Sequence, residues 1–237
     1  MREEFPGYYR PTDAEFAALW AECDFVLDTS ALLNLYRLPQ QASDTVMDIL
    51  GAIQNRLWIP HQAAWEYQRR RRDVIAQQAG AYTEIQRKLR DACDKLGNEL
   101  RQYKRHPFIE VDALLEEVEH AAGEIAKRLE ASRAQHPDLL KEDKTRDGLT
   151  QLFWGRVGTP YTNDRLQEIY REGEKRYKCR TPPGFKDEEK GHPDKYGDFV
   201  LWCQVMDHAR ETNRPSILVT DDRKEDWWWK SHDGKTM

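Results

Sequence analysis

The chain has 237 residues, of which 39 % are apolar and 33 % are charged, and its net charge is −5. This length suits one large domain, or one domain with a sizeable insertion. The negative charge excludes a surface that grips nucleic acid everywhere and restricts such contacts to local basic patches. The four cysteines form no CxxC pair, which argues against a zinc ribbon or a disulfide framework and favours a reducing cytosol. With no apolar signal-peptide core and no run of ~18 apolar residues, we expect a cytoplasmic protein without a membrane segment.

The first part of the chain alternates between predicted strands and helices. Thr12 and Asp13 are typical of a helix cap, and residues 25–27 form a short apolar strand that ends on Asp28. Further strand and helix patterns follow at 31–38 (helix), 44–53 (helix), 57–59 (strand) and 63–68 (helix). Alternation of this kind predicts an α/β fold with a parallel central sheet flanked by helices.

The closing elements repeat the same order. A helix is expected near 198–210, and residues 216–219 read as an apolar strand that runs into Thr220, Asp221 and Asp222. Between 138 and 185 glycines and prolines interrupt the pattern, and we expect irregular structure around shorter helices there.

The middle of the chain carries two apolar stripes with helical spacing. They are Tyr82, Ile85, Leu89, Ala92, Leu96, Leu100 and Tyr103, then Val111, Leu115, Val118, Ala122, Ile125 and Leu129. Two such stripes on either side of a turn at Pro107 predict a long antiparallel helical hairpin whose stripes bury each other. We therefore divide the chain into a core of residues 1–72 and 134–237 and an inserted hairpin of residues 73–133.

Five acidic residues stand where strands end or helices begin: Asp28, Glu66, Asp198, Asp221 and Asp222. The carboxyl edge of an open parallel sheet is where such folds bind ligands, so these acids are expected to converge there. Each also has an ordinary interpretation. The aspartates could be helix caps or turn formers, and Glu66, which precedes arginines, could be a solvated ion-pair residue.

Carboxylates held close together repel one another unless protons or cations neutralise them. Hard oxygen ligands select Mg²⁺ or Mn²⁺, and two such ions ~4 Å apart can clamp the attacking and leaving oxygens of a phosphodiester. The acids therefore predict a divalent-metal site suited to phosphodiester hydrolysis.

The order of these motifs resembles the PIN domain family over essentially the whole chain. Residues 25–33 resemble its first motif, Glu66 the second acid, Asp198 the third, and Thr220 to Asp222 the closing motif, with Asp222 as the fourth acid. Residues 157–161, 182–187, 196–198 and 221–228 are similar to the larger PIN-like domain of bacterial proteins. The resemblance implies a PIN-like fold and a metal-dependent nuclease with Asp28, Glu66, Asp198 and Asp222 as catalytic and metal-binding residues, beside Asp221 as a further candidate ligand.

One departure from compact PIN domains is the distance between the second and third acids, which are 198 − 66 = 132 residues apart. The hairpin fills much of that gap, at a place similar to that of the helical arch of flap endonucleases. This likeness concerns position alone and proves no function. Larger PIN-like proteins usually continue beyond the closing strand, so we expect the sequence to be part of a longer chain.

Several other residues are candidates for substrate contact. Ser30, Arg69 and Arg70 could meet a substrate phosphate, although the arginines could equally form a solvated basic face. The run Trp227 to Trp229 could stack on bases, but packing of a terminal segment is the commoner use. Asp187 could add an outer contact to a metal, but a turn is the favoured interpretation.

The predicted function is cleavage of RNA or single-stranded nucleic acid, and one rival is left open. A PIN-like domain without catalysis could serve as a nucleic-acid or protein interaction module, with the hairpin as a surface for partner binding or self-association. The hairpin's first arm is rich in basic residues that could instead guide a strand: Arg87, Lys88, Arg90, Lys95, Arg101, Lys104 and Arg105.

Overall fold

The computed structural model describes residues 1–228 and divides the chain into two compact units. The core unit comprises Met1–Arg71 and Thr145–Met237, and the helical unit comprises Arg72–Lys144. Within the described residues, every helix is too short or too polar to cross a membrane. The expectations for Trp229 and for the residues after it lie outside the described residues.

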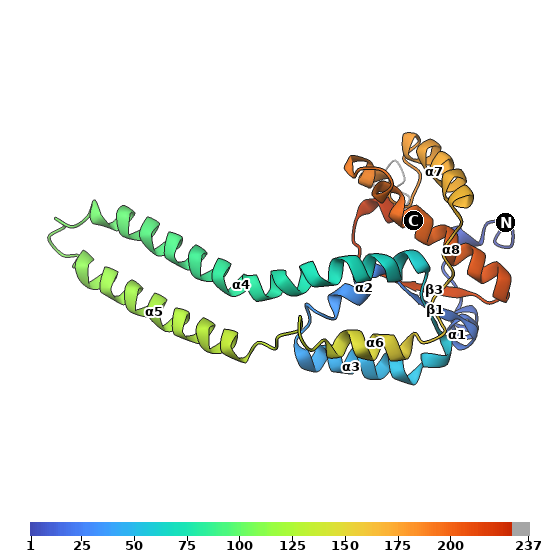
Figure 1. Cartoon of the computed structure of the whole chain (residues 1–237). Helices are drawn as coiled ribbons and strands as arrows, with labels where there is room; N and C mark the ends of the chain where they lie inside the picture. Colours follow the sequence, from blue (N-terminus) through green and yellow to red (C-terminus); the bar gives the residue numbers. More distant parts are fainter. Residues whose placement is uncertain (229–237) are drawn as a thin grey trace. The chain divides into compact units, whose positions relative to one another are not determined.

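A small parallel sheet organises the core unit. Its strands are β1 (Asp24–Leu27), β2 (Leu57–Trp58) and β3 (Ser216–Val219), in the order β2-β1-β3. Phe25 on the central strand stands beside Leu57 on one side and Ile217 on the other, and both pairings are parallel. All four residues of β1 are buried, the charged Asp24 at its start as well as the apolar run from Phe25 to Leu27. The three strands therefore end at one edge, which Figure 1 shows beneath α8.

Helices surround this sheet. In the core unit they are α1 (Asp13–Glu22), α2 (Thr29–Asn34), α3 (Gln40–Ala52), the first part of α4 (His61–Arg101), α6 (Lys144–Leu152), α7 (Asn163–Lys178) and α8 (Gly197–Thr212). Short 3₁₀ helices connect them: η1 (Pro6–Tyr8), η2 (Gln54–Arg56), η3 (Phe185–Glu189), η4 (Asp194–Tyr196) and η5 (Glu225–Trp227). The α/β class and the parallel sheet agree with the sequence prediction, although the protein is mostly helical.

Local sequence signals explain several helix boundaries. The Thr12 hydroxyl accepts a hydrogen bond from Glu15 N at 3.2 Å, and the Glu15 carboxylate accepts one from Thr12 N at 2.7 Å. This reciprocal pair satisfies free N–H groups at the start of α1, and it confirms the predicted cap.

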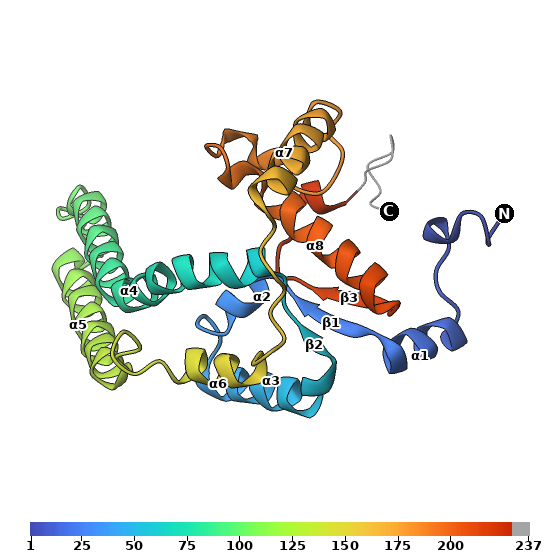
Figure 2. The same cartoon turned by 45° about the vertical axis from the view of Figure 1, so that its right-hand side comes forward.

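The segment between 138 and 185, where shorter helices were expected, contains α6 and the longer helix α7. Helix α7 has 16 residues, and it buries Ile169, Gly173 and Tyr177, which recur every four residues. A Cβ atom on Gly173 would lie 2.8 Å from the Tyr196 ring, so the missing side chain lets α7 pack closely. Figure 2 shows α7 beside α8, where Ile169 and Tyr177 share a buried cluster with Phe199 and Val200.

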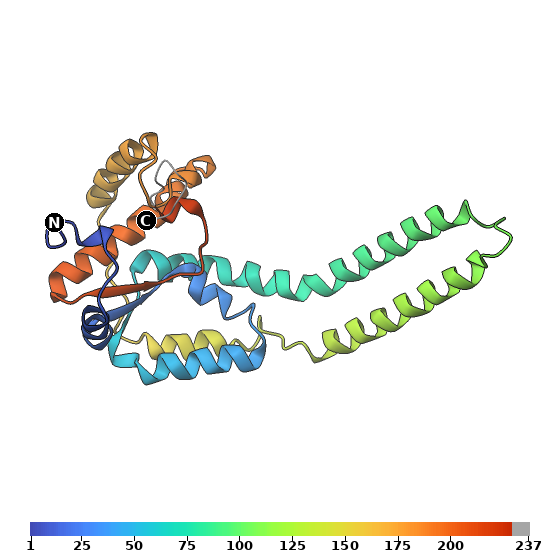
Figure 3. The same cartoon turned by 180° about the vertical axis from the view of Figure 1, so that it is seen from behind.

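Helices α3 and α6 lie side by side in all three views of the molecule (Figures 1–3). Gly148 on α6 makes this approach possible, because a Cβ there would stand 2.7 Å from the Met47 side chain of α3. Residues more than 90 apart in sequence thus pack together, and they support the sheet on the side away from α8.

The helical unit consists mainly of the later part of α4 and of α5 (Val111–Gln135). Contacts join Tyr82 to His136, Gln86 to Glu130, and Lys104 to Asp112, so the two helices run in opposite directions (Figure 3). Helix α4 continues without a break from His61, so no turn separates Glu66 from this unit.

The two apolar stripes do not bury each other as fully as the sequence predicted. Ile85, Leu96 and Ile125 are 47 %, 39 % and 44 % exposed. A Cβ added at Gly97, the residue after Leu96, would lie 3.8 Å from the Leu115 side chain, so Gly97 lies on the side of α4 that faces α5. A pair of helices buries only the narrow stripe that faces its partner, so apolar residues on the flank of that stripe stay in contact with water.

Candidate active site

Asp28 is fixed at the end of β1 by hydroxyl groups from two distant segments. One of its carboxylate oxygens, Oδ2, accepts hydrogen bonds from Ser30 Oγ at 2.7 Å and Thr220 Oγ1 at 2.8 Å. The residue is 5 % exposed, and its backbone N–H donates to the carbonyl of Val219 on β3. Although Asp28 precedes α2, its side chain makes no capping hydrogen bond. Its carboxylate is therefore fixed by Ser30 and Thr220 and does not act as a helix cap.

Ser30 joins the ends of β1 and β3. In addition to its bond to Asp28, its hydroxyl lies 3.1 Å from Thr220 Oγ1 and accepts a hydrogen bond from Asp221 N at 2.9 Å. The structure thus engages this hydroxyl in holding Asp28, and a direct contact to substrate stays a prediction.

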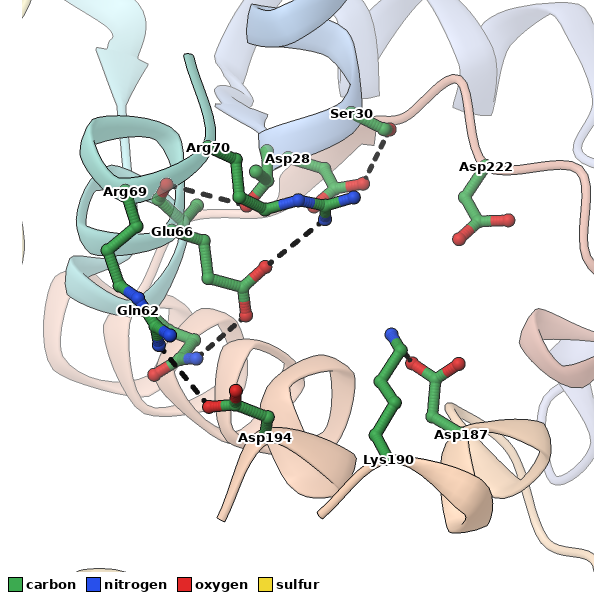
Figure 4. A network of polar contacts seen from close by, with 12 residues as sticks. Asp28, Ser30, Gln62, Glu66, Arg69, Arg70, Asp187, Lys190, Asp194 and Asp222 are labelled. Atoms are coloured by element: carbon green, nitrogen blue, oxygen red, sulfur yellow. Dashed lines mark hydrogen bonds and ion pairs between the residues drawn. The ribbon is translucent and has the colours of Figure 1, made fainter. Parts of the chain in front are cut away.

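Glu66 reaches the same edge from the second turn of α4. Gln62 donates a hydrogen bond to its Oε1 at 2.8 Å, and Arg70 lies 3.9 Å from its Oε2 (Figure 4). A Cβ atom on Gly197 would stand 2.5 Å from Glu66 Oε1, so a glycine there makes room for the carboxylate. Burial raises the pKa of Glu66, and the negative charge of Asp28 adds to the rise. Glu66 is therefore not the solvated residue of the ordinary interpretation.

Asp198 lies in the first turn of α8, and its Oδ2 is buried without a hydrogen-bond partner. Burial raises the pKa of this carboxyl to about 7, and repulsion from Asp187, Asp28 and Glu66 acts in the same direction. Gly184, at φ +86°, brings backbone close to Asp198, where a side chain would collide with its Cβ. Asp198 Oδ2 thus lacks a hydrogen-bond donor, and the nearby charge of Lys224 offsets the rise in the pKa only in part.

Asp222 and Asp221 both lie beyond β3, which ends at Val219, so strand alternation does not force them apart. Asp222 N donates to Thr220 Oγ1, and Asp222 Oδ1 accepts a hydrogen bond from Lys224 N at 2.8 Å. Figure 4 shows Asp222, Asp28 and Glu66 turned toward a common centre. Asp221 is exposed, and its described hydrogen bond is made by its backbone.

The two candidate arginines lie on α4 next to Glu66. Arg69 stacks over the Trp65 ring at 4.4 Å and pairs with Asp194 at 3.3 Å, whereas the guanidinium of Arg70 faces Glu66 and is largely exposed. Arg69 is therefore held in place by two partners, and Arg70 is the freer of the two.

Comparison with models of known protein families identifies the family of the chain. A family model described as "PIN like domain" matches residues 24–237. The chain belongs to the PIN-like domain family. Domains of this kind are typically metal-dependent nucleases. Comparison with the curated proteins and with the solved structures gave no match.

A further acid, for which the sequence favoured a turn, lies near the candidate site of this PIN-like domain, since its charge acts on Asp198. Asp187 lies in η3, and its side chain is 7 % exposed. Lys190 Nζ lies 2.5 Å from its Oδ2, and Lys224 Nζ lies 3.1 Å from its Oδ1. The Lys224 ammonium is also 3.5 Å from Asp222 Oδ2. Gly184, just before η3, was the available sequence signal for a close approach of this loop, and the structure gives it a positive φ.

The donor set of the PIN-like domain suits a hard divalent ion in its chemistry, since the ligands on offer are carboxylate oxygens. The unpartnered, buried Asp198 Oδ2 is an atom that such an ion would satisfy. As the side chains of residues 1–228 stand, however, no three His, Cys, Asp or Glu groups come together closely enough to hold an ion. The carboxylates gather at one edge without enclosing a metal.

Proposed function

We propose that this PIN-like domain is a divalent-metal-dependent nuclease that hydrolyses phosphodiester bonds of RNA or single-stranded nucleic acid. The observation that carries the proposal is the gathering of carboxylates from separate segments at the carboxyl edge of the sheet, with one buried oxygen left unpartnered. Such an arrangement costs stability through repulsion unless cations neutralise it, so its persistence at a ligand-binding edge favours a metal site.

The proposed roles follow from how each acid is held. Asp28 and Asp222 are the principal ligands for Mg²⁺ or Mn²⁺, and Asp198 and Glu66 complete the site or orient its waters. Asp221 is a weaker candidate ligand, because its side chain is exposed. A bound ion would supply Lewis-acid polarisation of the phosphoryl oxygen and would lower the pKa of water.

The remaining polar groups of the site would position the acids and the substrate. Ser30 and Thr220 fix one oxygen of Asp28, and Gln62 fixes one oxygen of Glu66. Arg70, exposed beside Glu66, and Arg69, held by Trp65 and Asp194, would bind phosphates of the strand. Fixed first contacts of this kind reduce the reorganisation that the reaction requires.

A second candidate function is a non-catalytic interaction module, and the helical unit favours it. Ile85, Leu96 and Ile125 leave apolar surface exposed on α4 and α5, and apolar side chains of this kind are often used to bind a partner protein or a second copy. In that case the acids would be a remnant, and metal would not support any cleavage.

A substrate panel tests the proposal. Labelled single-stranded RNA, single-stranded DNA and duplexes would be incubated with the protein in Mn²⁺, beside a variant in which Asp28, Glu66, Asp198 and Asp222 are all alanine. We expect Mn²⁺-dependent products from a single-stranded substrate with the wild type and none with the variant. Equal cleavage by both proteins, or none by either, would leave the interaction module as the better account.

A further inference from the structure

The ammonium of Lys190 stands among the acids of the proposed site. The lysine follows η3, and its side chain extends toward the centre that Asp28, Glu66 and Asp222 face (Figure 4). Its described ion pair is with Asp187, at 2.5 Å, and its positive charge also lowers the pKa of Glu66. One flexible cation thus acts on carboxylates from two separate elements.

The two partners of this ion pair differ in how firmly they are held. Asp187 is almost fully buried and cannot move without disturbing η3, whereas the Lys190 side chain is 48 % exposed. Holding an exposed lysine in one conformation costs side-chain entropy, so such a pair is weak and readily exchanged. The carboxylate is therefore fixed while its cation is replaceable.

Lys224, the second cation at Asp187, is anchored differently. Its backbone N–H donates to Asp222 Oδ1, and its ammonium is shared between Asp187 and Asp222. Burial lowers its pKa, but the hydrogen bond and the charge of Asp187 outweigh this and hold the pKa at about 12. The Lys224 side chain is 44 % exposed, close to the 48 % of Lys190, but its ammonium is shared by two acids. Lys190, with Asp187 as its one described ion-pair partner, is therefore the cation that a metal can displace more readily.

We propose that Lys190 is a resident counter-ion of the acidic site, and that a divalent cation displaces it from Asp187 on binding. The proposal rests on the proposed metal site. It follows from the general requirement that gathered carboxylates be neutralised, by a tethered ammonium before the metal binds and by the metal afterwards. Asp187 then becomes a fifth carboxylate available to the metal or to its waters, and the loop of η3 responds to loading of the site.

The matched control is Lys186, which lies in η3, the 3₁₀ helix just before Lys190, but pairs with Glu225. Mn²⁺ affinity would be measured by calorimetry for the wild type, Lys190→Met and Lys186→Met. We expect Lys190→Met to bind Mn²⁺ roughly tenfold more tightly, because the metal no longer competes with a charge-assisted hydrogen bond. Lys186→Met should stay within about twofold of the wild type, since the described ion pair of Lys186 is with Glu225 and not with an acid of the proposed site.

A second measurement uses the wild-type protein, so it does not depend on how the variants fold. Lysines would be acylated with a limiting amine-reactive ester, with and without Mn²⁺, and the modified residues would be identified by mass spectrometry. We expect Mn²⁺ to raise acylation of Lys190 several-fold and to leave Lys186 unchanged.

The outcomes separate this inference from the proposed function. Mn²⁺ that binds the wild type without raising Lys190 acylation, or that binds both methionine variants alike, overturns the counter-ion role and leaves the metal site intact. A wild type that binds no Mn²⁺ overturns the metal site itself, and the exchange with it.

Discussion

The exposed charged side chains of α4 and α5 and the buried acid Asp28 of the core unit find their partners over very different distances along the chain. On α4 and α5 the pairs Glu84–Lys88, Arg87–Asp91 and Glu124–Lys127 are three or four residues apart and exposed. In the core unit Asp28 is bound by Thr220, 192 residues away. Exposed helical pairs contribute little to stability, whereas a buried acid depends on partners that the fold alone supplies.

Ionised carboxylates of the candidate site therefore lower the stability of the core unit, whereas the exposed acids of α4 and α5 do not lower that of the helical unit. Asp198 has a raised pKa and an unpartnered oxygen, and Glu66 has a raised pKa, whereas the exposed acid Glu84 on α4 has its pKa lowered by its hydrogen bond to Lys88. Strain of this kind is a common property of functional sites. Substitutions in the core unit should therefore change activity and pH dependence, and those in the helical unit should change binding and stability by smaller amounts.

The largest expected effect is that of Asp28→Asn. Asparagine keeps an acceptor for Ser30 and Thr220, so the fold should stay intact, but the lost charge should lower the cleavage rate on the order of a thousandfold. Single-turnover cleavage in Mn²⁺ measures the loss. Asp24→Asn, at the opposite end of the same strand, is the control and should retain activity. An Asp28→Asn protein that cuts at the wild-type rate would refute the assignment.

The acid pattern shows how far the sequence alone could lead. Asp28 and Asp222 were identifiable because each follows an apolar strand, and parallel strands bring their ends to one edge whatever the rest of the fold. Glu66 and Asp198 were identifiable from motif resemblance. Their burial was not predictable, because it depends on the close approach of Gly197 to Glu66 and of Gly184 to Asp198. The fold class and the sheet were predictable because short apolar runs of strand length can be recognised locally in the sequence, as for β1.

Asp187, Lys190 and Lys224 show what the sequence could not reveal. Their contacts join a 3₁₀ helix to a loop some 37 residues away, and no periodic pattern encodes such a pairing. Shorter helices were expected in the segment that contains α7, but the bounds of α7 were not predicted, because glycine and proline around it masked its four-residue repeat. In the helical unit the spacing predicted helices correctly, but it could not tell Ile85 and Leu96 on the flank from the residues that face α5.

The next effect concerns pH. In the metal-free protein the pKa of Asp198 is raised to about 7 from 3.8, so the folded state binds this proton more tightly than the unfolded chain does. Stability is therefore fully present below pH ~4 and is lost as pH rises toward ~7, by at most ~4 kcal/mol from this group. Glu66, with a raised pKa, acts in the same direction.

Thermal unfolding in chelator from pH 4 to 8 checks this sign. Asp198→Asn should melt at a higher temperature than the wild type at pH 8, and the gap should close toward pH 4. Mn²⁺ should remove much of the loss in the wild type, because a bound cation replaces the proton. A gap that is constant across this range would mean that Asp198 does not titrate in the window. Asp164→Asn, exposed at the start of α7, is the control.

A smaller effect is expected from basic residues of the helical unit. Lys88→Ala, Lys95→Ala, Arg101→Ala and Lys104→Ala, combined, should weaken binding of single-stranded nucleic acid by about tenfold and lower its salt dependence, by about one unit of slope for each lost phosphate contact. The effect is limited because Lys88 and Lys104 already pair with Glu84 and Asp112.

Binding titrations at several salt concentrations, with sedimentation of each protein, separate two roles for these residues. The basic residues of α5, Lys127, Arg128 and Arg133, provide the control set, and replacing them should change binding less. Normal binding by a variant that sediments as a smaller species would assign the helices to assembly instead of strand guidance.

The smallest effect compares one kind of substitution in the two units. A Cβ added at Gly80, inside α4, meets nothing within 4 Å, whereas one added at Gly197 would collide with Glu66 Oε1. Gly80→Ala should stabilise the protein by ~0.5–1 kcal/mol, because alanine loses less backbone entropy in a helix. Gly197→Ala should instead displace Glu66 and reduce cleavage. Melting temperatures test the first expectation, with a rise of about 1–4 °C if the units unfold together. If Gly80→Ala leaves the main unfolding transition unchanged and moves only a separate transition of the helical unit, the two units unfold independently. The units would then differ in stability as well as in the chemistry of their charged residues.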